Sequence, residues 1–462
     1  MARRRHRRKG KGSRTAQPKV MHPDAAGLDI GATEVYAAVR PERDPDPIRN
    51  FATFTADLHA LADWLKECEV TTVAMESTGV YWIPVYQILE AHGFDVVLVN
   101  ARHVHSVPGR KSDVADCEWL RYLHSVGLLR GSFRPADEVC ALRSVLRHRD
   151  TLIKMASRSV LHMQKAYSQM NVHLHHAISD LTGTTGLAIT DAILAGERDP
   201  ARLAALADRR IKASRETLIK ALQGDWRAEH LLALRHARAT YAHYQQLITE
   251  CDQEIEAGIR AFEASSEPPG AVGDDPPDEG IDAEPEAPTE SPAKRFDLRG
   301  HLTHLFGTDL TLIPGIGEST ALVLFTELGP ELSRFPTAPQ FASWLHLCPH
   351  NQITGGKIIS SHTGRGTNRA AQALHWATQS LYRSPSALGQ HFRRMRARLG
   401  TPEATTAVAH KLARIIYHLI THRVAYDDSI LAAEERQDRR RFERRLRRQA
   451  HALGYELVPE AA

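Results

Sequence analysis

Four acidic side chains occupy positions at which a carboxylate has little structural reason to occur. Asp29 and Glu76 each end an apolar run with the composition of a β-strand. Asp113 and Asp116 are three residues apart at the start of a helix-like segment, so their side chains share one face. Carboxylates that converge repel one another unless cations hold them together, and Mg²⁺ is a hard cation that prefers oxygen ligands. The pattern predicts a site for two magnesium ions about 4 Å apart, which suits phosphodiester chemistry.

The elements that would position these carboxylates lie in residues 23–135, which read as alternating strands and helices. We predict strands at 25–30, 35–39, 51–54, 70–75 and 95–99, and helices at 58–67 and 81–91. Three strands followed by helix–strand repeats indicate a mixed sheet with helices packed on it. This is the order expected of an α/β RNase H-like (RuvC-like) domain, in which Asp29 ends the first strand and Glu76 the fourth.

The rest of the chain divides by composition. Helical spacing of apolar residues marks 136–263 as a coiled-coil arm, an antiparallel helical hairpin that would mediate dimerisation. A helical bundle packed on its own domain fits this spacing equally well. Residues 264–297 are rich in Pro and acid and are expected to be a disordered linker. We expect a mainly α domain at 298–425, a basic helical tail at 426–462 and a basic disordered tail at 1–22.

Charge is strongly segregated along the 462 residues, although the formal net charge is only +4. Residues 2–19 carry nine Lys/Arg and no acid, and residues 436–448 carry eight Arg against two acids. Residues 267–293 carry nine Asp/Glu and seven Pro without any Lys or Arg. Arg-rich runs bind phosphates, so nucleic acid is the expected partner, although a solvated tail would have the same composition.

Several classes of protein are excluded by composition. No apolar run approaches the ~20 residues needed to span a bilayer, and no apolar stretch follows the basic N-terminus as it would in a signal peptide. Five scattered cysteines match no zinc spacing and no disulfide framework. We therefore expect a cytoplasmic protein that has no membrane partner.

Residues 298–425 carry a second set of candidate groups. Gly315 and Gly317 precede a helix in a run typical of a helix-hairpin-helix element, whose backbone N–H groups hold a phosphate. An ordinary tight turn between helices is the alternative.

The polar loop that follows offers a hydroxyl, backbone donors and cations that could clamp phosphates. Its candidate residues are Thr354, Gly355, Gly356, Lys357, Arg365 and Arg369. A Gly-Gly β-turn needs no functional reason, however. From the residues alone, Ser360, Ser361 and Thr363 are as eligible as Thr354 to act as a nucleophile.

Both halves of the chain resemble the DEDD transposases of bacterial insertion sequences, of the insertion-sequence-110 type. The resemblance covers most of the chain apart from the tails and the acidic linker, and it is specific because separate motifs fall in the right order. These motifs are Gly-Leu-Asp-Ile-Gly, Met-Glu-Ser-Thr-Gly-Val-Tyr, Lys-Ser-Asp-Val-Ala-Asp, Ile-Pro-Gly-Ile-Gly and the block from Thr-Gly-Gly-Lys to Asn-Arg-Ala.

The resemblance implies a division of labour between the two halves. Asp29, Glu76, Asp113 and Asp116 would form the metal-binding tetrad, and the C-terminal transposase domain would supply a nucleophilic hydroxyl that becomes covalently linked to DNA. Sites from different subunits would form one composite centre. The resemblance also implies a structured guide RNA that pairs with donor and target DNA, a dimer that becomes a tetramer on synapsis, and association with the bacterial nucleoid. The expected activity is that of a magnesium-dependent DNA transposase or recombinase.

One position departs from the family pattern, because the family's serine falls on Thr354. Threonine keeps the hydroxyl, but its methyl group restricts the rotamer and crowds an in-line attack. Three interpretations follow: Thr354 is the nucleophile, Ser360 or Ser361 replaces it, or this copy is impaired. We expect the first.

Two other functions fit parts of the sequence. A RuvC-like nuclease or junction resolvase would use the carboxylates to activate water and would form no covalent link with DNA. A non-catalytic DNA-binding remnant would bind element ends through the glycine hairpin and the Arg-rich tails, with a steep salt dependence. The intact set of four acids favours an enzyme.

Overall fold

The computed structural model describes residues 19–77, 79–100, 113–266, 296–349, 351–364 and 368–456. The chain forms two compact units, Met1–Arg134 and Pro135–Ala462. The basic run before residue 19, most of the predicted acidic linker, and Arg365 lie outside the described residues.

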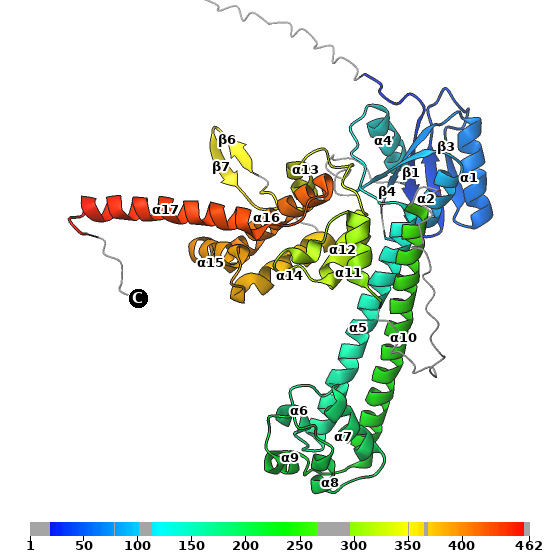
Figure 1. The fold of residues 1–462 in the computed structure, drawn as a ribbon. Helices are drawn as coiled ribbons and strands as arrows, with labels where there is room; N and C mark the ends of the chain where they lie inside the picture. Colours follow the sequence, from blue (N-terminus) through cyan, green and yellow to red (C-terminus); the bar gives the residue numbers. More distant parts are fainter. Residues whose placement is uncertain are drawn as a thin grey trace, which may run out of the picture. The chain divides into compact units, whose positions relative to one another are not determined.

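A five-stranded mixed sheet forms the centre of the first unit (Figure 1). In spatial order its strands are β3 (Ile48–Ala52), β2 (Glu34–Ala38), β1 (Ala25–Ile30), β4 (Thr72–Glu76) and β5 (Asp95–Val99). The strands β1, β2 and β3 are antiparallel neighbours, whereas β1, β4 and β5 run parallel to one another. The expected α/β class, with three leading strands followed by helix–strand repeats, is confirmed.

Alternation along the strands separates two faces of this sheet. Ala26, Leu28 and Ile30 of β1 are buried in a core that also contains residues of α1 (Thr55–Glu67) and α2 (Trp82–Ala91). The opposite face is covered by α4 (Asp113–Ser125), whose Leu120 packs with Val97 and Val99 of β5.

The third strand was predicted three residues too late, at 51–54. It begins at Ile48, directly after Pro47, whose carbonyl accepts a hydrogen bond from the Val39 N–H at 2.9 Å. As an edge strand, β3 has no fully buried residue, so it lacks the apolar run from which a strand is usually recognised.

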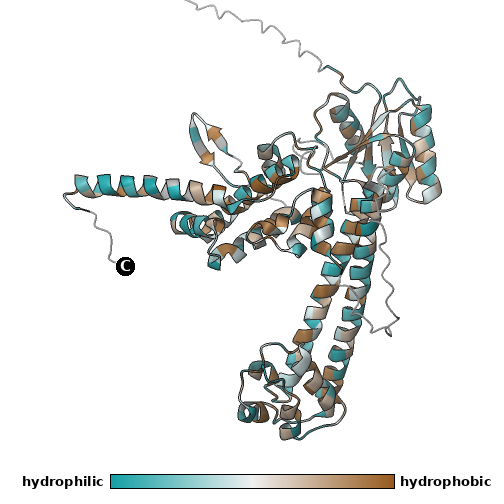
Figure 2. Cartoon of the chain, viewed as in Figure 1, coloured by the Kyte–Doolittle hydropathy of each residue, from teal (hydrophilic) through white to brown (hydrophobic). Residues whose placement is uncertain are grey.

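Two long helices dominate the first part of the second unit. They are α5 (Asp137–Gln169) and α10 (Ala228–Ser266). They are antiparallel, because Arg149 pairs with Asp252 while Leu142, earlier in α5, lies against Gly258, later in α10. The apolar stripe expected in α10 is buried at Ile248, Cys251, Ile255 and Ile259, and hydrophilic residues line the outer faces of both helices (Figure 2).

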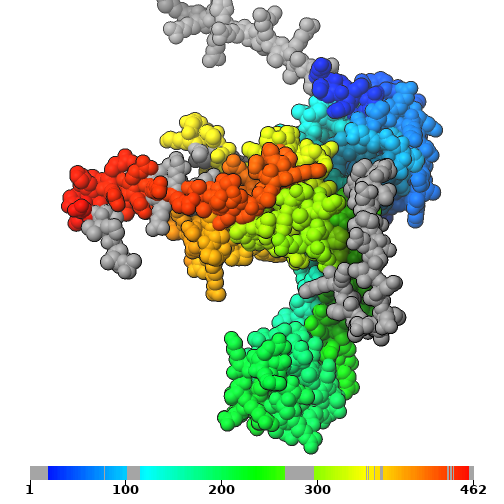
Figure 3. All heavy atoms as spheres, viewed as in Figure 1, coloured from blue at the N-terminus to red at the C-terminus, as the bar shows by residue number. Residues whose placement is uncertain are grey.

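The segment that joins the two long helices folds into a small helical head, which was not predicted from the sequence. It contains α6 (Leu174–Ala177), α7 (Thr184–Leu194), α8 (Pro200–Ala205) and α9 (Arg215–Ala221). Figure 3 shows the head as a rounded mass at the end of the helical pair. It has its own core, which includes Met163, Tyr167, Ile189 and Leu222.

A mainly helical region follows. Its elements are α11 (Leu298–Phe306), η1 (Leu310–Leu312), α12 (Glu318–Leu328), α13 (Ala338–Trp344), β6 (Gln352–Thr354), β7 (Lys357–Ser360), α14 (Arg369–Ser380), η2 (Leu381–Arg383), α15 (Ala387–Leu399), α16 (Thr401–His422) and α17 (Asp428–Ala452). The C-terminal helix α17 is hydrophilic over most of its length (Figure 2). None of the helices in the described part of the chain is both long and apolar enough to cross a membrane.

An ion-pair cluster ties this region to α5. Glu327 of α12 is 8% exposed and accepts hydrogen bonds from Arg147 at 2.8 and 2.9 Å. Arg143 donates to the backbone carbonyls of Thr326 and Glu327 at 2.8 and 3.1 Å, which satisfies carbonyls at the C-terminus of α12.

Candidate active site

Two of the predicted carboxylates lie side by side at the ends of parallel strands. Leu28 of β1 is paired in register with Met75 of β4, and the next residue on each strand is Asp29 and Glu76, respectively. Neighbouring strands are about 4.8 Å apart. Leu28 and Met75 both point into the core beneath α1 and α2, so Asp29 and Glu76 both project from the other face.

Helix α4 covers that same face and brings its first turn to the same end of the strands. Near its C-terminus, His124 Nε2 lies 2.8 Å from the Thr72 hydroxyl, at the first residue of β4. Eight residues of helix, from His124 back to Asp116, span about 12 Å. Four residues of strand, from Thr72 to Glu76, span about 13 Å. From these lengths we infer that Asp116 lies about level with Glu76.

Gly27 sets the distance between α4 and the sheet. A Cβ at this position would lie 2.3 Å from the Arg121 backbone nitrogen and 2.4 Å from the Cys117 carbonyl oxygen. The backbones are thus too close to admit any side chain, and neither atom can move without moving the helix. The motif that contains Asp29 therefore also contains the glycine that sets this distance, and Gly27 was not among the predicted site residues. A glycine inside an otherwise apolar strand is the signal that could have revealed it.

The charge of Asp29 reaches Cys117, the residue after Asp116. Burial raises the pKa of the Cys117 thiol to about 12, and the negative charge of Asp29 adds to the shift. The thiol consequently stays protonated at neutral pH. The predicted ligands at this edge are carboxylate oxygens, the donors that magnesium prefers.

For the fourth predicted acid, Asp113, the structure describes the backbone position and not the side chain. Asp113 is the first residue of α4, one helical turn before Asp116, which is half-buried; the side chain of Asp113 is outside the described part. Among the side chains that are described, no three His, Cys, Asp or Glu form a ready-made metal cluster. Magnesium binding by Asp29, Glu76, Asp113 and Asp116 therefore stays a prediction.

Thr354 lies in the second unit, on a small exposed hairpin. It ends β6 and is paired with Lys357 of β7 across the two-residue turn Gly355–Gly356. Both glycines have positive φ, 56° and 77°, as a tight type I′ turn requires. Thr354 and Lys357 are exposed, so the hydroxyl and the ammonium group stand next to each other in solvent.

The other predicted phosphate-binding residues fall into different environments. Gly317 is the N-cap of α12 and has open space around it. Gly315 has φ 91° and lies against α14, because a Cβ there would be 2.6 Å from the Ala377 carbonyl oxygen. Arg369 forms an ion pair with Asp150 at 3.0 Å, which accounts for its charge without a phosphate.

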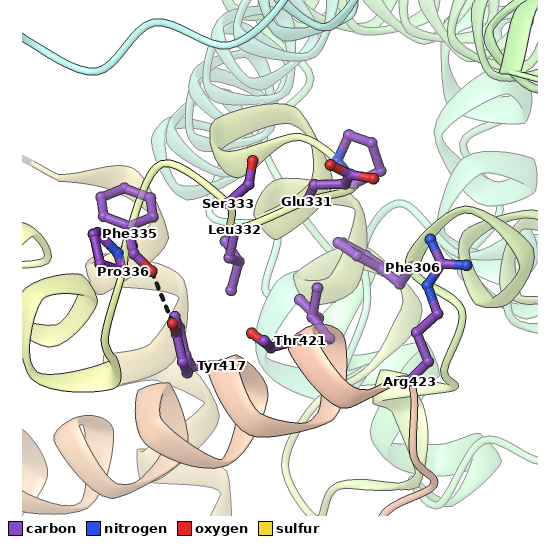
Figure 4. Close-up of a pocket in the computed structure, with 11 residues that line it drawn as sticks. Phe306, Glu331, Leu332, Ser333, Phe335, Pro336, Tyr417, Thr421 and Arg423 are labelled. Atoms are coloured by element: carbon purple, nitrogen blue, oxygen red, sulfur yellow. Dashed lines mark hydrogen bonds between the residues drawn. The ribbon is translucent and has the colours of Figure 1, made fainter.

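A cavity in the second unit contains none of the predicted residues. It has a volume of about 350 Å³ and lies between α16 and the loop after α12 (Figure 4). Phe306, Leu332 and Tyr417 line it, and the Tyr417 hydroxyl donates to the Phe335 carbonyl at 2.8 Å. Its lining mixes apolar residues with Glu331, Ser333, Thr421 and Arg423, and it contains a single carboxylate rather than a cluster of them.

Comparisons with known proteins match both halves of the chain. A DEDD transposase family model of the IS110 type matches residues 26–171, and a model of the transposase IS116/IS110/IS902 family matches residues 307–393. The first range contains all four predicted acids, and the second contains Gly315, Gly317 and Thr354. The chain is also similar to the insertion element IS110 uncharacterized 43.6 kDa protein of Streptomyces coelicolor, with 29% identity over 134 residues. That match covers 29% of this chain and 33% of the Streptomyces protein, about a third of its length. On the evidence of two family models in the expected order, this chain belongs to the IS110 family of transposases.

Proposed function

We propose that this protein is a metal-dependent DNA transposase that cuts and rejoins strands through a covalent threonine–DNA intermediate. The observation that carries the proposal is the position of Asp29 and Glu76 at adjoining ends of parallel strands, beneath the first turn of the helix that bears Asp113 and Asp116. Family membership supports DNA as the substrate.

The four carboxylates would hold two magnesium ions, which polarise the scissile phosphate and stabilise the negative charge of the transition state. The Thr354 hydroxyl oxygen attacks phosphorus. One P–O bond forms to threonine, the P–O bond to the leaving sugar oxygen breaks, and the threonine proton passes through solvent to that oxygen. Attack by a sugar hydroxyl of the new partner strand reverses these changes, so no bond energy is lost. Lys357 balances charge on the phosphate beside Thr354.

Asp29 and Thr354 belong to separate compact units, and the proposed reaction requires both at one phosphate. In the proposed assembly they come from different subunits of a dimer, and two dimers hold donor and target DNA at synapsis. A structured guide RNA would supply sequence recognition, since base pairing can read sequence while the protein binds backbones.

The test is to trap protein–DNA adducts on a strand-cleavage substrate, with magnesium, before and after protease digestion. Thr354→Ala should abolish the protease-sensitive adduct and Thr354→Ser should retain it. Asp29→Asn should lower cleavage about 1,000-fold or more. Glu34→Gln is the matched control, because Glu34 is an exposed acid on the neighbouring strand β2.

Two results would contradict the proposal. Cleavage by the wild type without any adduct would favour a nuclease that activates water. An undiminished adduct from Thr354→Ala would move the nucleophile to another residue, and Ser360→Ala and Ser361→Ala would then identify it.

A further inference from the structure

One segment of the second unit has an unusual charge composition. Residues 332–402 contain no Asp or Glu and nine Lys/Arg, in a chain with 55 acids among 462 residues. The segment includes the hairpin that carries Thr354 and the helices α14 and α15. This run of 71 residues without an acid is strongly basic and attracts polyanions, although Asp150 of α5 pairs with Arg369.

Three arginines of α15 and η2 form no ion pair within the described part of the chain. Arg393 donates to the backbone carbonyls of Tyr382 and Ser384 at 3.1 and 2.7 Å, and the Arg396 guanidinium lies 4.4 Å from the Tyr382 ring centre. Among the described residues, no carboxylate pairs with Arg383, Arg393 or Arg396. Their charge is available to an external anion.

An exposed tryptophan lies within this positive segment. Trp376 of α14 is 61% exposed, whereas Trp64 is 4% exposed and the remaining four tryptophans are half-buried. In the described part of the chain, the ring of Trp376 stacks on no other ring and no cation, in contrast to that of Tyr382. The indole of Trp376 therefore presents a face on which a planar partner can stack.

The neighbours of Trp376 on the helix are polar. Gln372, Trp376, Gln379 and Arg383 recur at spacings of four, three and four, and all four are exposed. They form one stripe, because such spacings keep side chains on one side of a helix. Two amides and a guanidinium around an indole can hydrogen-bond base edges and phosphates while the ring stacks on a base. An apolar protein partner would find polar side chains on both sides of the ring.

We propose that Trp376 is a base-stacking platform for an unpaired nucleotide, and that the acid-free surface around it holds the phosphates of that strand. The proposal rests on the proposed function, because strand exchange creates unpaired bases. The stacking proposal adds the residue that holds one of these unpaired bases. Stacking needs only the π-face of a base, so DNA and RNA are both eligible, and the experiment distinguishes them.

The intrinsic fluorescence of the full-length protein provides the test, because Trp376 is its one exposed tryptophan. Mixed-sequence 20-nucleotide single strands of DNA and of RNA, and the matching DNA duplex, are titrated into the protein in EDTA. Omitting divalent cations makes binding independent of the carboxylate chemistry, so a failure of the cleavage proposal leaves this result interpretable. Single strands should quench the wild-type emission, and most of the quenching should be lost in Trp376→Phe.

Affinity measured with dye-labelled strands gives the second readout. Trp376→Ala should weaken single-strand binding about fivefold or more, while Trp376→Phe should keep most of the affinity because phenylalanine also stacks. Duplex binding should change less, because paired bases are not available to the ring. Phe54→Ala is the matched control, since Phe54 is an aromatic residue of the first unit that is 74% exposed. A loss confined to RNA or to DNA would support stacking and would identify the bound strand.

Three outcomes would overturn the proposal. The first is single-strand affinity that is unchanged in Trp376→Ala. The second is an equal loss for duplex and single strand, which would indicate a contact with backbone alone. The third is protection of Trp376 from acrylamide that grows with protein concentration without nucleic acid, which would assign the ring to contact between copies of the chain. If the Trp376→Ala variant does not fold, the fluorescence of Trp376→Phe is the test: quenching by single strands that persists in this variant would overturn the proposal.

Discussion

The two groups assigned to chemistry lie on elements of opposite character. Asp29 and Glu76 end buried strands of a five-stranded sheet, under a helix whose backbone touches the sheet at Gly27. Thr354 lies on a two-stranded hairpin whose residues Ile353 and Ile359 are 62% and 68% exposed. Metal ligands must keep a fixed geometry, so they need the rigid support of a buried sheet. A nucleophile that must reach a phosphate bound elsewhere benefits from the mobility of an exposed hairpin.

The largest effect should come from filling the contact between α4 and the sheet. Gly27→Ala places a methyl group against two backbone atoms, so α4 must move and carry Asp116 with it. We expect cleavage to fall about 100-fold and the free energy of unfolding to fall by about 2–3 kcal/mol, as measured by strand-cleavage rate and urea denaturation. Gly131→Ala is the control, because its new methyl group would meet only the Val97 side chain at 3.5 Å. Equal behaviour of the two variants would mean that the close approach does not position the acids.

The stability of the same face should depend on pH through His124. Burial lowers the pKa of His124 to about 4, and the nearby charge of His22 lowers it further while Asp95 opposes the shift. The folded state thus binds fewer protons than the unfolded state between about pH 6.5 and 4. The stabilisation is complete above pH 6.5 and is lost as the pH falls toward 4, by about 2–3 kcal/mol.

Hydrogen exchange of β1 and β4 between pH 4.5 and 7 measures this change locally. His124→Gln should flatten the dependence, since glutamine does not titrate. The same loss of protection at low pH in the variant would show that another group is responsible.

Mutation of the contact between α12 and α5 should lower stability less than mutation of the sheet. Glu327→Ala leaves Arg143 and Arg147 without their carboxylate in a partly buried site, and we expect a loss of about 2 kcal/mol after allowance for the exposure of Arg147. Thermal unfolding is the measurement. Glu229→Ala, which breaks an exposed pair with Arg227, should leave the unfolding temperature unchanged. An equally small shift in Glu327→Ala would indicate that apolar packing alone holds α12 to α5.

The smallest effect is expected at the hairpin turn. Gly356→Ala forces an alanine to φ 77° in open space, so the cost of about 1 kcal/mol should be confined to β6 and β7. The unfolding temperature should not change, while the yield of covalent adduct should fall severalfold because Thr354 is less well presented. A drop in unfolding temperature would show that the hairpin is integral to the domain.

The sequence predicted the first unit better than the second, for physical reasons. β1 was placed with its correct ends because it is a buried strand, and the edge strand β5 because Val96–Val99 are all apolar, whereas the edge strand β3 lacks that signal. The position of α4 over the sheet could not be read from periodicity, because Gly27 acts through its missing side chain. The helical head depends on contacts between residues as distant as Met163 and Leu222, which no local pattern records.

The candidate site shows the same contrast between features with a local sequence signal and features that depend on distant contacts. Motif order selected the four candidate acids, and the strand register brings Asp29 and Glu76 to adjoining strands. The ion pair of Arg369 with Asp150 joins residues 219 positions apart, so no local pattern predicts it. Trp376 was missed because exposure of an aromatic residue on an amphipathic helix becomes visible only when the other faces are packed.

The antiparallel course of α5 and α10 has an evolutionary consequence. The chain leaves the neighbourhood of α12 along α5 and returns along α10, whose Phe262 packs edge-on against Phe325 of α12. Insertions or deletions that lengthen both helices by matching turns would therefore leave the anchoring contacts untouched. Relatives can therefore differ in the length of the α5–α10 pair and in the helical head that it carries, without any change to the contacts with α12.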